Sequence, residues 1–286
     1  MKPRATPTPA SGGPATLFFL ALAATTALVA LLALPFIGLL ARVTPAGILV
    51  HLAQPQVLVA LRLSLFTTLA STATVIVLGT PTAYLLVTRE FPGKRLLEVL
   101  LQLPMVLPPT VAGFALLMAF GRAGFAGRAL DVLGISLPFT TLGVVVAQVF
   151  MAAPFYIAPA RAGLGSIDRR YLEAADTLGA GEAFRFFRVM LPIALPALLS
   201  GVAMSAARAL GEFGATITFA GNFPGTTQTM PLAVYVAMQS DLDTAVVLSV
   251  LLLLMSFGLL LGLRSAPAGW LGIQARAGTP GSLSAR

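Results

Sequence analysis

Six long apolar runs constrain the fold of this chain more than any other feature of its sequence. A helix needs about 20 mostly apolar residues to cross the hydrocarbon core of a membrane. The runs cover Leu17–Ala41, Val57–Val87, Val99–Phe120, Thr140–Ala162, Ala194–Ala220 and Thr244–Leu263. Only 10% of the residues are charged, against about 25% in soluble domains, which excludes an ordinary water-facing surface. The sequence therefore predicts an all-α integral membrane protein with six helices.

The first run allows a second interpretation, because Lys2 and Arg4 before an apolar stretch also describe a secretory signal peptide. The run is about 25 residues long, whereas the apolar core of a signal peptide has roughly 7–15 residues. No convincing cleavage site follows it. We therefore expect an uncleaved helix over residues 17–41.

The positions of Lys and Arg predict the topology, because positive charges accumulate in cytoplasmic loops. With the N-terminus inside, thirteen of the eighteen basic residues fall in cytoplasmic segments: Lys2, Arg4, Arg89, Lys94, Arg95, Arg161, Arg169, Arg170, Arg185, Arg188, Arg264, Arg276 and Arg286. Three lie in outside loops and two within helices: Arg42, Arg122 and Arg128, then Arg62 and Arg208. We expect both termini in the cytoplasm. The net charge of +8 is thus explained by topology and does not indicate a nucleic-acid partner.

The apolar runs also define the expected domain organisation. Residues 1–16 and 264–286 are expected to be cytoplasmic tails, and residues 17–41 the first transmembrane helix. A transmembrane domain is expected over residues 60–263, with a cytoplasmic loop at 166–192. Its helices are expected near 60–87, 99–120, 140–162, 194–220 and 244–263.

The residue types exclude most catalytic and metal chemistry. The chain has no cysteine and a single histidine, His51, so thiolate nucleophiles, disulfides and multi-histidine metal sites are excluded. No G-x-x-x-x-G-K-[ST] phosphate loop is present, since Gly93-Lys94-Arg95 lacks the earlier glycine and the hydroxyl. We expect no catalytic residue, no metal site and no cofactor, and an ATP-driven process would need ATP hydrolysis on a partner.

Two opposite charges lie near the middle of the fifth run. Arg208 and Glu212 would together cost roughly 5–7 kcal/mol if they faced lipid, so we expect them to face protein or a water-filled cavity. On a continuous helix they pair at one-turn spacing and share a narrow arc with Gly201, Ser205 and Thr216. One interpretation makes Arg208, Glu212, Ser205 and Thr216 the lining or gate of a pathway. The other is an internal ion pair with hydroxyls bonded to their own helix.

The second and third runs carry related features. A stripe of hydroxyls follows one face of the second run and allows the same two interpretations: Ser64, Thr67, Thr68 and Ser71. The third run contains Pro104, Pro108 and Pro109, which remove backbone donors and disrupt a helix. Inside a membrane such a break requires protein or water to satisfy the freed carbonyls. We expect either a broken helix beside a cavity or a simple kink at the membrane surface.

The polar loop over residues 166–191 is the most informative segment. Ser166 or Asp168 can cap a short helix, Gly179 is placed to end it, and a second short helix is expected over 182–190. Five apolar residues give the loop an apolar face: Leu172, Ala175, Leu178, Phe184 and Phe187. In a cytoplasmic loop such a face needs lipid headgroups, the helix bundle or another protein to cover it.

The same loop carries a long spaced pattern. It reads Glu173-Ala174-Ala175, three residues, Gly179, nine residues, Val189, one residue and Leu191-Pro192. This pattern resembles the EAA loop of ATP-binding cassette (ABC) importer permeases, with Val where Ile is usual. The resemblance implies that a short coupling helix enters a groove on an ATPase subunit. The docking residues would be Glu173, Ala174, Ala175, Gly179, Leu191 and Pro192.

Further segments resemble the molybdate permeases of bacterial importers, with sulfate and tungstate permeases as close relatives. They are Phe91-Pro92-Gly93-Lys94, Leu103-Pro104 through Pro108-Pro109, Leu178-Gly179-Ala180-Gly181, Arg208–Thr216 and Gly221–Thr229. The resemblance runs from about Ala60 to Leu263 and implies a six-helix type I importer permease bundle in the bacterial cytoplasmic membrane. It also implies two copies of this chain, two ATPase subunits and an extracytoplasmic oxyanion-binding protein. Since some family members have only the five later helices, the role of residues 17–41 stays open.

Three functions are compatible with a polytopic membrane chain. The resemblance implies an importer permease for molybdate, with tungstate, sulfate and thiosulfate as alternatives because all are tetrahedral dianions of similar charge. A secondary transporter driven by an ion gradient would use Arg208 and Glu212 as a proton or ion relay. Such a carrier has no ATPase to dock, so the EAA-type loop argues against it. An intramembrane enzyme would need a convergent nucleophile and base or a metal set, which the sequence lacks. We therefore expect the importer permease.

Overall fold

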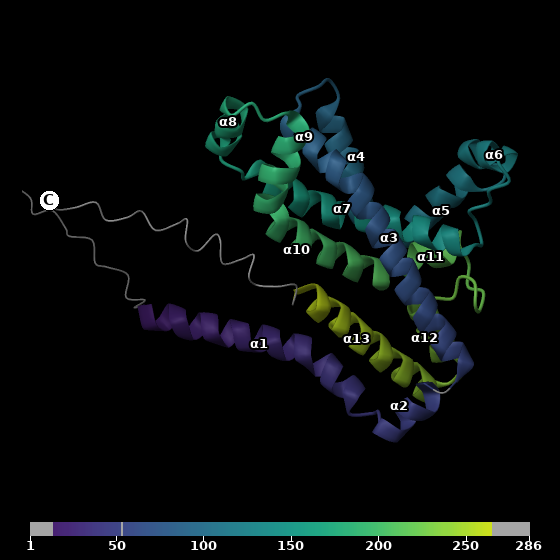
Figure 1. Cartoon of the computed structure of the whole chain (residues 1–286). Helices are drawn as coiled ribbons and strands as arrows, with labels where there is room; N and C mark the ends of the chain where they lie inside the picture. Colours follow the sequence, from purple (N-terminus) through teal and green to yellow (C-terminus); the bar gives the residue numbers. More distant parts are fainter. Residues whose placement is uncertain (1–13, 53, 265–286) are drawn as a thin grey trace, which may run out of the picture.

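The computed structural model describes residues 14–52 and 54–264, and in this part of the chain every regular element is helical (Figure 1). The elements are α1 (Pro14–Leu40), α2 (Pro45–Leu52), α3 (Pro55–Thr88), α4 (Lys94–Val106), α5 (Pro109–Phe120), α6 (Phe125–Val132), α7 (Thr141–Gly165), α8 (Arg169–Thr177), α9 (Glu182–Phe184), the π-helical turn η1 (Arg185–Met190), α10 (Leu191–Leu210), α11 (Gly214–Phe219), α12 (Met230–Ser240) and α13 (Leu242–Arg264). The expected tails, residues 1–16 and 264–286, lie almost entirely outside the described residues.

The described helices divide into membrane-spanning and short ones. Five are long and apolar enough to cross a membrane: α1, α3, α7, the continuous helix α9–η1–α10, and α13. The pair α4 and α5 passes the same test together but is bent by 120° at its break. Counting this pair as one span gives six, so the prediction of an all-α membrane protein is confirmed.

The centre of the bundle is α7, which packs against both α3 and α10 (Figure 1). Tyr156 of α7 is 1% exposed and lies between two glycines, Gly79 of α3 and Gly201 of α10. A Cβ atom on Gly79 would lie 2.8 Å from the Tyr156 ring, so these helices approach closely because the glycines carry no side chain. The Tyr156 hydroxyl shares a 2.6 Å hydrogen bond with Thr80, which satisfies its polar end.

The first helix stands apart from this core. In Figure 1, α1 runs along the edge of the molecule, and it packs against α13. Its apolar side chains from Leu17 to Leu40 are exposed almost throughout, and none of its spanning window is buried within this chain. Since such a surface is unstable in water, α1 requires lipid or another protein around it.

Two expected single helices are broken in the structure. The third run divides into α4 and α5 around Leu107 and Pro108, which gives the broken helix rather than the simple kink. The fifth run was expected to be one helix near 194–220, but α10 ends at Leu210 and α11 begins at Gly214. Helix periodicity alone did not reveal this second break, because the apolar run continues beyond it; the local signals were Gly211, which caps the end of α10, and Gly214, which begins α11.

A third expectation concerns the second short helix over residues 182–190. The structure instead continues from Glu182 to Leu210 without interruption. Pro192 was expected to separate the two helices because it lacks a backbone N–H. The helix passes it through η1, in which the Leu191 N–H bonds to the Phe186 carbonyl, a wider π-type turn that accommodates an irregular hydrogen-bond pattern.

Candidate functional site

The loop between α7 and α10 begins with a capped helix. The Asp168 side chain accepts a 3.0 Å hydrogen bond from the Arg170 N–H at the start of α8. The Ser166 hydroxyl instead donates to the Gly163 carbonyl at 2.9 Å. Of the two capping residues that the sequence allowed, Asp168 therefore caps α8.

The same helix ends in a glycine turn. Gly179 has a φ of +77°, a left-handed conformation that costs glycine little. The Ala180 N–H bonds to the Ala175 carbonyl and the Gly179 N–H to the Asp176 carbonyl, both at 3.0 Å. This pair of bonds satisfies the terminal carbonyls of α8 and turns the chain sharply toward α9.

The structure separates the predicted docking residues into two groups. Glu173 and Ala174 are exposed on α8, whereas Ala175 is buried at 8% exposure. Leu191 packs against the core around Tyr156, and Pro192 is exposed at the start of α10. The short helix and its glycine turn therefore form the accessible part of the loop, while Leu191 anchors it to the bundle.

An apolar groove of about 540 Å³ opens beside the glycine turn. It is lined by Tyr171, Ala174, Ala175, Leu178, Gly179, Ala180, Gly181, Phe184 and Val189. The expected single apolar face is divided, because Leu172 packs toward the core while Leu178 is 87% exposed. Phe184 and Phe187 are also exposed. An exposed apolar groove with aromatic edges favours occupation by another protein.

Polar contacts fix the groove relative to the bundle. Arg185 approaches both carboxylate oxygens of Asp176 at 3.0 and 3.1 Å, which ties the helical turn η1 to α8. Glu182 accepts from Arg89 at 2.8 Å and from the Tyr84 hydroxyl at 3.1 Å, which ties the start of α9 to the end of α3. Exposed ion pairs contribute little stability singly, so their main effect here is on orientation.

The second predicted set lies at the break between α10 and α11. The side chains of Arg208 and Glu212 form an ion pair at 2.5 Å, although the contact lacks hydrogen-bond geometry. Glu212 is 1% exposed, and its other carboxylate oxygen accepts a 2.8 Å bond from the Ala215 N–H. Glu212 therefore also caps α11, where a negative charge complements the helix dipole.

The other two members of this set are buried in protein. Ser205 and Thr216 each have an exposed fraction of 0%, and neither hydroxyl has a hydrogen-bond partner among the described residues. The expected continuous arc with Arg208 and Glu212 does not exist, because α10 has already ended before Glu212. The ion pair was predicted from helical spacing and forms across a turn instead.

The two broken helices meet each other at close range. A Cβ atom on Gly214 of α11 would lie 2.7 Å from the Pro109 Cβ of α5. A Cβ atom on Gly113 would lie 2.6 Å from the Ala215 carbonyl oxygen. Since both glycines allow backbone contact, the break in one helix is positioned by the break in the other.

The hydroxyl stripe of α3 is buried, and its members have different roles. Thr67 and Ser71 donate to carbonyls of their own helix, at 3.3 and 3.0 Å. The Ser64 hydroxyl accepts a 2.7 Å bond from the Met230 N–H and so caps α12 across the fold. These contacts favour the structural interpretation for Ser64, Thr67 and Ser71, whereas the buried Thr68 hydroxyl has no hydrogen-bond partner among the described residues.

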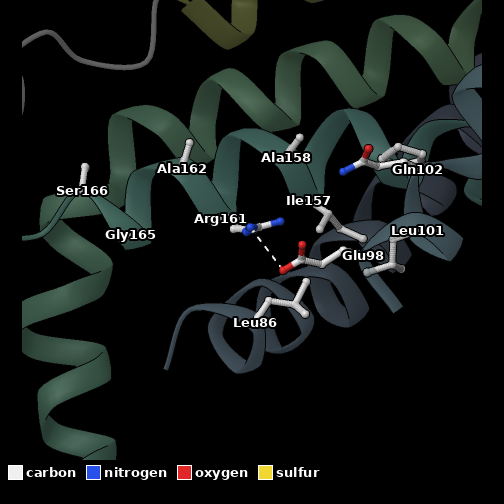
Figure 2. Close-up of a pocket in the computed structure, with 11 residues that line it drawn as sticks. Leu86, Glu98, Leu101, Gln102, Ile157, Ala158, Arg161, Ala162, Gly165 and Ser166 are labelled. Carbon is white, nitrogen blue, oxygen red and sulfur yellow. Dashed lines mark ion pairs between the residues drawn. The ribbon is translucent and has the colours of Figure 1, made fainter. Parts of the chain in front are cut away.

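Sequence reasoning also missed a polar pair that connects α4 to α7. The Glu98 carboxylate and the Arg161 guanidinium lie 3.2 Å apart at the edge of a cavity of about 500 Å³ (Figure 2). Arg161 had been assigned only to the positive-inside pattern. The signal that could have revealed the pair is the amphipathic pattern of α4, in which Leu96, Val99 and Leu100 are exposed while Glu98 faces α7.

This arrangement of helices and loop can be compared with known proteins. A protein family described as the binding-protein-dependent transport system inner membrane component matches residues 75–263. The chain belongs to this family. It is therefore a transport component of the inner membrane, and the family predicted from the EAA-type pattern is confirmed.

The chain is similar in sequence to permease proteins of molybdenum and sulfate transport systems. The chain is 41% identical to the molybdenum transport system permease protein ModB of Mycobacterium tuberculosis over 230 residues, which cover 80% of this chain and 87% of the relative. It is 46% identical to ModB of Escherichia coli K12 over 159 residues, or 55% and 69% of the two chains. The sulfate transport system permease protein CysT of Salmonella typhimurium is 39% identical over 186 residues, or 65% and 67%.

Solved structures show the same fold. The bacterial ABC transporter that imports the acidic polysaccharide alginate matches with a TM-score of 0.71 and 15% identity, covering 87% of this chain and 94% of that one. The MetNI methionine ABC transporter matches with a TM-score of 0.60 and 19% identity, covering 74% and 94%. At these identities the likeness establishes the fold, and it confirms an importer-type permease bundle.

Proposed function

We propose that this chain is the permease subunit of an ATP-driven importer that moves molybdate across the cytoplasmic membrane by alternating access. The observation that carries the proposal is the 41% identity to ModB of Mycobacterium tuberculosis, which extends over 87% of that protein. The bundle of apolar helices and the accessible groove of the loop between α7 and α10 support the same conclusion.

The energy source belongs to a partner in this proposal. The sequence contains no phosphate-binding loop, and the accessible groove beside Gly179 is lined mostly by apolar side chains. We assign this groove, with Glu173, Ala174, Ala175, Leu191 and Pro192 around it, to docking of an ATPase subunit. Two copies of this chain would then bind two ATPase subunits, and an extracytoplasmic protein would deliver the oxyanion.

The proposed pathway includes the break between α10 and α11. An ion pair of Arg208 and Glu212 is expensive to keep inside a membrane, and a broken helix is tolerated where it is covered by protein or lines a cavity. We assign Arg208 and Glu212 to the pathway or its gate. Ser205 and Thr216 belong to the same region, and their unbonded hydroxyls make them available to an alternative arrangement of these helices.

The test is uptake by whole cells. The chain is expressed with its ATPase and binding protein in a bacterium that lacks molybdate uptake, and accumulation of radioactive molybdate is measured. We expect uptake that tungstate inhibits strongly and sulfate weakly. An ATPase variant unable to hydrolyse ATP is the control, and we expect it to abolish uptake; uptake that persists would support an ion-coupled carrier and contradict the proposal.

A sulfate permease is the second candidate, because CysT is 39% identical over 67% of its length. Sulfate and molybdate are both tetrahedral dianions, so the helices of the permease need not distinguish them. Accumulation of sulfate without accumulation of molybdate in the same cells would establish this alternative and overturn the molybdate assignment.

A further inference from the structure

The cavity between α3, α4 and α7 holds charged and polar side chains that the proposed transport function leaves unassigned. It has a volume of about 500 Å³, within the range of small-molecule sites, and apolar side chains form most of its wall. Polar side chains enter the lining from Glu98 and Gln102 of α4, Arg161 of α7 and Ser166 beyond its end. Figure 2 shows the Glu98 carboxylate and the Arg161 guanidinium turned toward each other inside this lining.

The Arg161 guanidinium is under-used in this arrangement. It has five N–H donors, yet within residues 14–52 and 54–264 its polar contact is a single 3.2 Å approach to Glu98. The Gln102 side chain lies one helical turn from Glu98 on the same face of α4, and it has no hydrogen-bond partner among the described residues. The Arg161 side chain is 40% exposed and Gln102 is exposed, so their remaining donors are open to water, which an oxyanion entering the cavity can replace.

A second cavity of about 410 Å³ adjoins the first and shares Glu98 and Arg161 with it. Its other charged side chains are Glu90, Lys94 and Arg95. Lys94 is paired with Glu90 at 2.6 Å, and Arg95 is exposed. Three basic against two acidic residues leave one positive charge, so the field around the pair favours an anion.

The position of the pair relates it to the direction of transport. Arg161 lies about one turn before α7 ends at Gly165, and the capped helix α8 of the docking loop follows directly. The pair is therefore at the end of the bundle that carries the proposed ATPase groove. In an importer this end is the one at which substrate leaves.

We propose that the Glu98–Arg161 pair is an exit site for the transported tetrahedral oxyanion, which replaces Glu98 as the partner of Arg161 while Gln102 donates to it. The inference rests on the proposed oxyanion import. Glu98 occupies Arg161 when no oxyanion is present and competes with it when one arrives. Binding is therefore weak, as release into the cell requires.

Because the Glu98 carboxylate and the oxyanion compete for Arg161, substitutions of the two residues should change molybdate affinity in opposite directions. Glu98→Gln removes the competitor and should strengthen binding of molybdate roughly tenfold, which is the effect of one charge-assisted hydrogen bond. Arg161→Gln removes the binding group and should weaken it by at least as much. A purely structural ion pair would respond alike to both changes, because either one breaks it.

The experiment uses the assembled complex of permease and ATPase in nanodiscs of neutral lipid. Binding of radioactive molybdate is measured by equilibrium dialysis for the wild type, Glu98→Gln, Arg161→Gln and the control Arg128→Gln. Arg128 lies exposed on α6, outside the cavity, so this control removes the same charge elsewhere. Thermal unfolding of each complex shows whether a variant has lost its structure, and the milder Arg161→Lys replaces Arg161→Gln if it has.

Opposite shifts for Glu98→Gln and Arg161→Gln, with Arg128→Gln unchanged, support the exit site. Equal shifts in molybdate affinity for the two variants, or an affinity that does not depend on Arg161, overturn it.

An anionic phospholipid is the other ligand that this lining fits. If nanodiscs containing phosphatidylglycerol show lipid retention that Arg161→Gln abolishes, while molybdate binding is unaffected, the site belongs to lipid and the proposal fails. Molybdate uptake by wild-type cells is scored separately, so these failures leave the transport function standing, whereas absent uptake overturns that function itself.

Discussion

Gly214 lies directly against Pro109, so closely that a Cβ atom on the glycine would be 2.7 Å from the proline Cβ and 3.1 Å from the backbone nitrogen of Thr110. This contact joins the start of α11 to the start of α5, the two places where membrane-spanning helices are broken. Each break exposes backbone groups that a membrane cannot satisfy. Packing the breaks against each other covers them with protein.

The first prediction concerns this contact. Gly214→Ala should lower the free energy of unfolding by about 1–3 kcal/mol, because it overpacks a rigid backbone contact. Gly211→Ala is the matched control, since its Cβ would meet the Ala207 carbonyl oxygen at an ordinary 3.6 Å. Thermal unfolding of the detergent-solubilised protein measures both. Equal melting temperatures for the two variants would contradict the close approach of α5 and α11.

The second prediction concerns the glycine turn of the docking loop. Gly179→Ala should destabilise the turn by about 1–2 kcal/mol, because φ is +77° there and alanine is strained in that conformation. Gly134→Ala is the control: its φ is +71°, and neither glycine has an atom within 4 Å of the added Cβ, but Gly134 follows α6 and lies outside the docking loop. We expect Gly179→Ala to reduce co-purification of the ATPase and Gly134→Ala to leave it intact.

A charge reversal tests the same docking assignment by a different route. Glu173→Lys changes an exposed residue of α8 and should leave the protein in the membrane while weakening its association with the ATPase. Undiminished ATPase recovery with both Glu173→Lys and Gly179→Ala would show that the partner docks elsewhere.

The third prediction separates the two roles of Glu212. Glu212→Gln keeps an oxygen to accept from the Ala215 N–H, whereas Glu212→Ala removes both the charge and the cap. Removing one partner of a buried pair costs about 3–5 kcal/mol, so Arg208→Ala alone should be less stable than Arg208→Ala combined with Glu212→Gln. Melting temperatures give the order, and molybdate uptake is measured on the same variants.

The uptake values decide between a structural pair and a pathway. If the double variant assembles and transports normally, the pair has only a structural role. Loss of uptake in an assembled double variant would place Arg208 or Glu212 in the pathway or gate. Single variants that match the wild type in both measurements would contradict the burial of the pair.

The fourth prediction tests the orientation of the chain, for which the absence of cysteine is useful. Leu178→Cys in the docking loop and Val132→Cys at the end of α6 place single thiols at two residues that are each 87% exposed. A membrane-impermeant maleimide added to intact spheroplasts should label Val132→Cys and not Leu178→Cys. Both should react once the membrane is permeabilised, and the reverse pattern would invert the topology.

Much of the fold was predictable because its signals are local. Apolar runs mark membrane helices without reference to any other part of the chain, and α3, α7 and α13 lie within a few residues of the predicted runs. The α8 cap at Asp168 and the turn at Gly179 were also predictable, since capping and left-handed glycine depend on neighbouring residues alone. The spaced pattern from Glu173 to Pro192 indicated the family without the structure, because all of its residues lie in one continuous segment.

The features that the sequence did not reveal depend on contacts between distant segments. Gly211 and Gly214 flank Glu212 and are local signals for the end of a helix, but only the structure shows that Gly214 packs against Pro109 at this break. Ser64 caps α12 although the two are far apart in the chain, and Glu98 meets Arg161 only because α4 packs against α7. The sequence by itself determined which segments enter the membrane and where the docking loop forms its capped helix and glycine turn, because hydrophobicity and capping act locally. Only the tertiary structure decided where helices break and which charges pair, because both depend on packing that brings distant residues within a few ångströms.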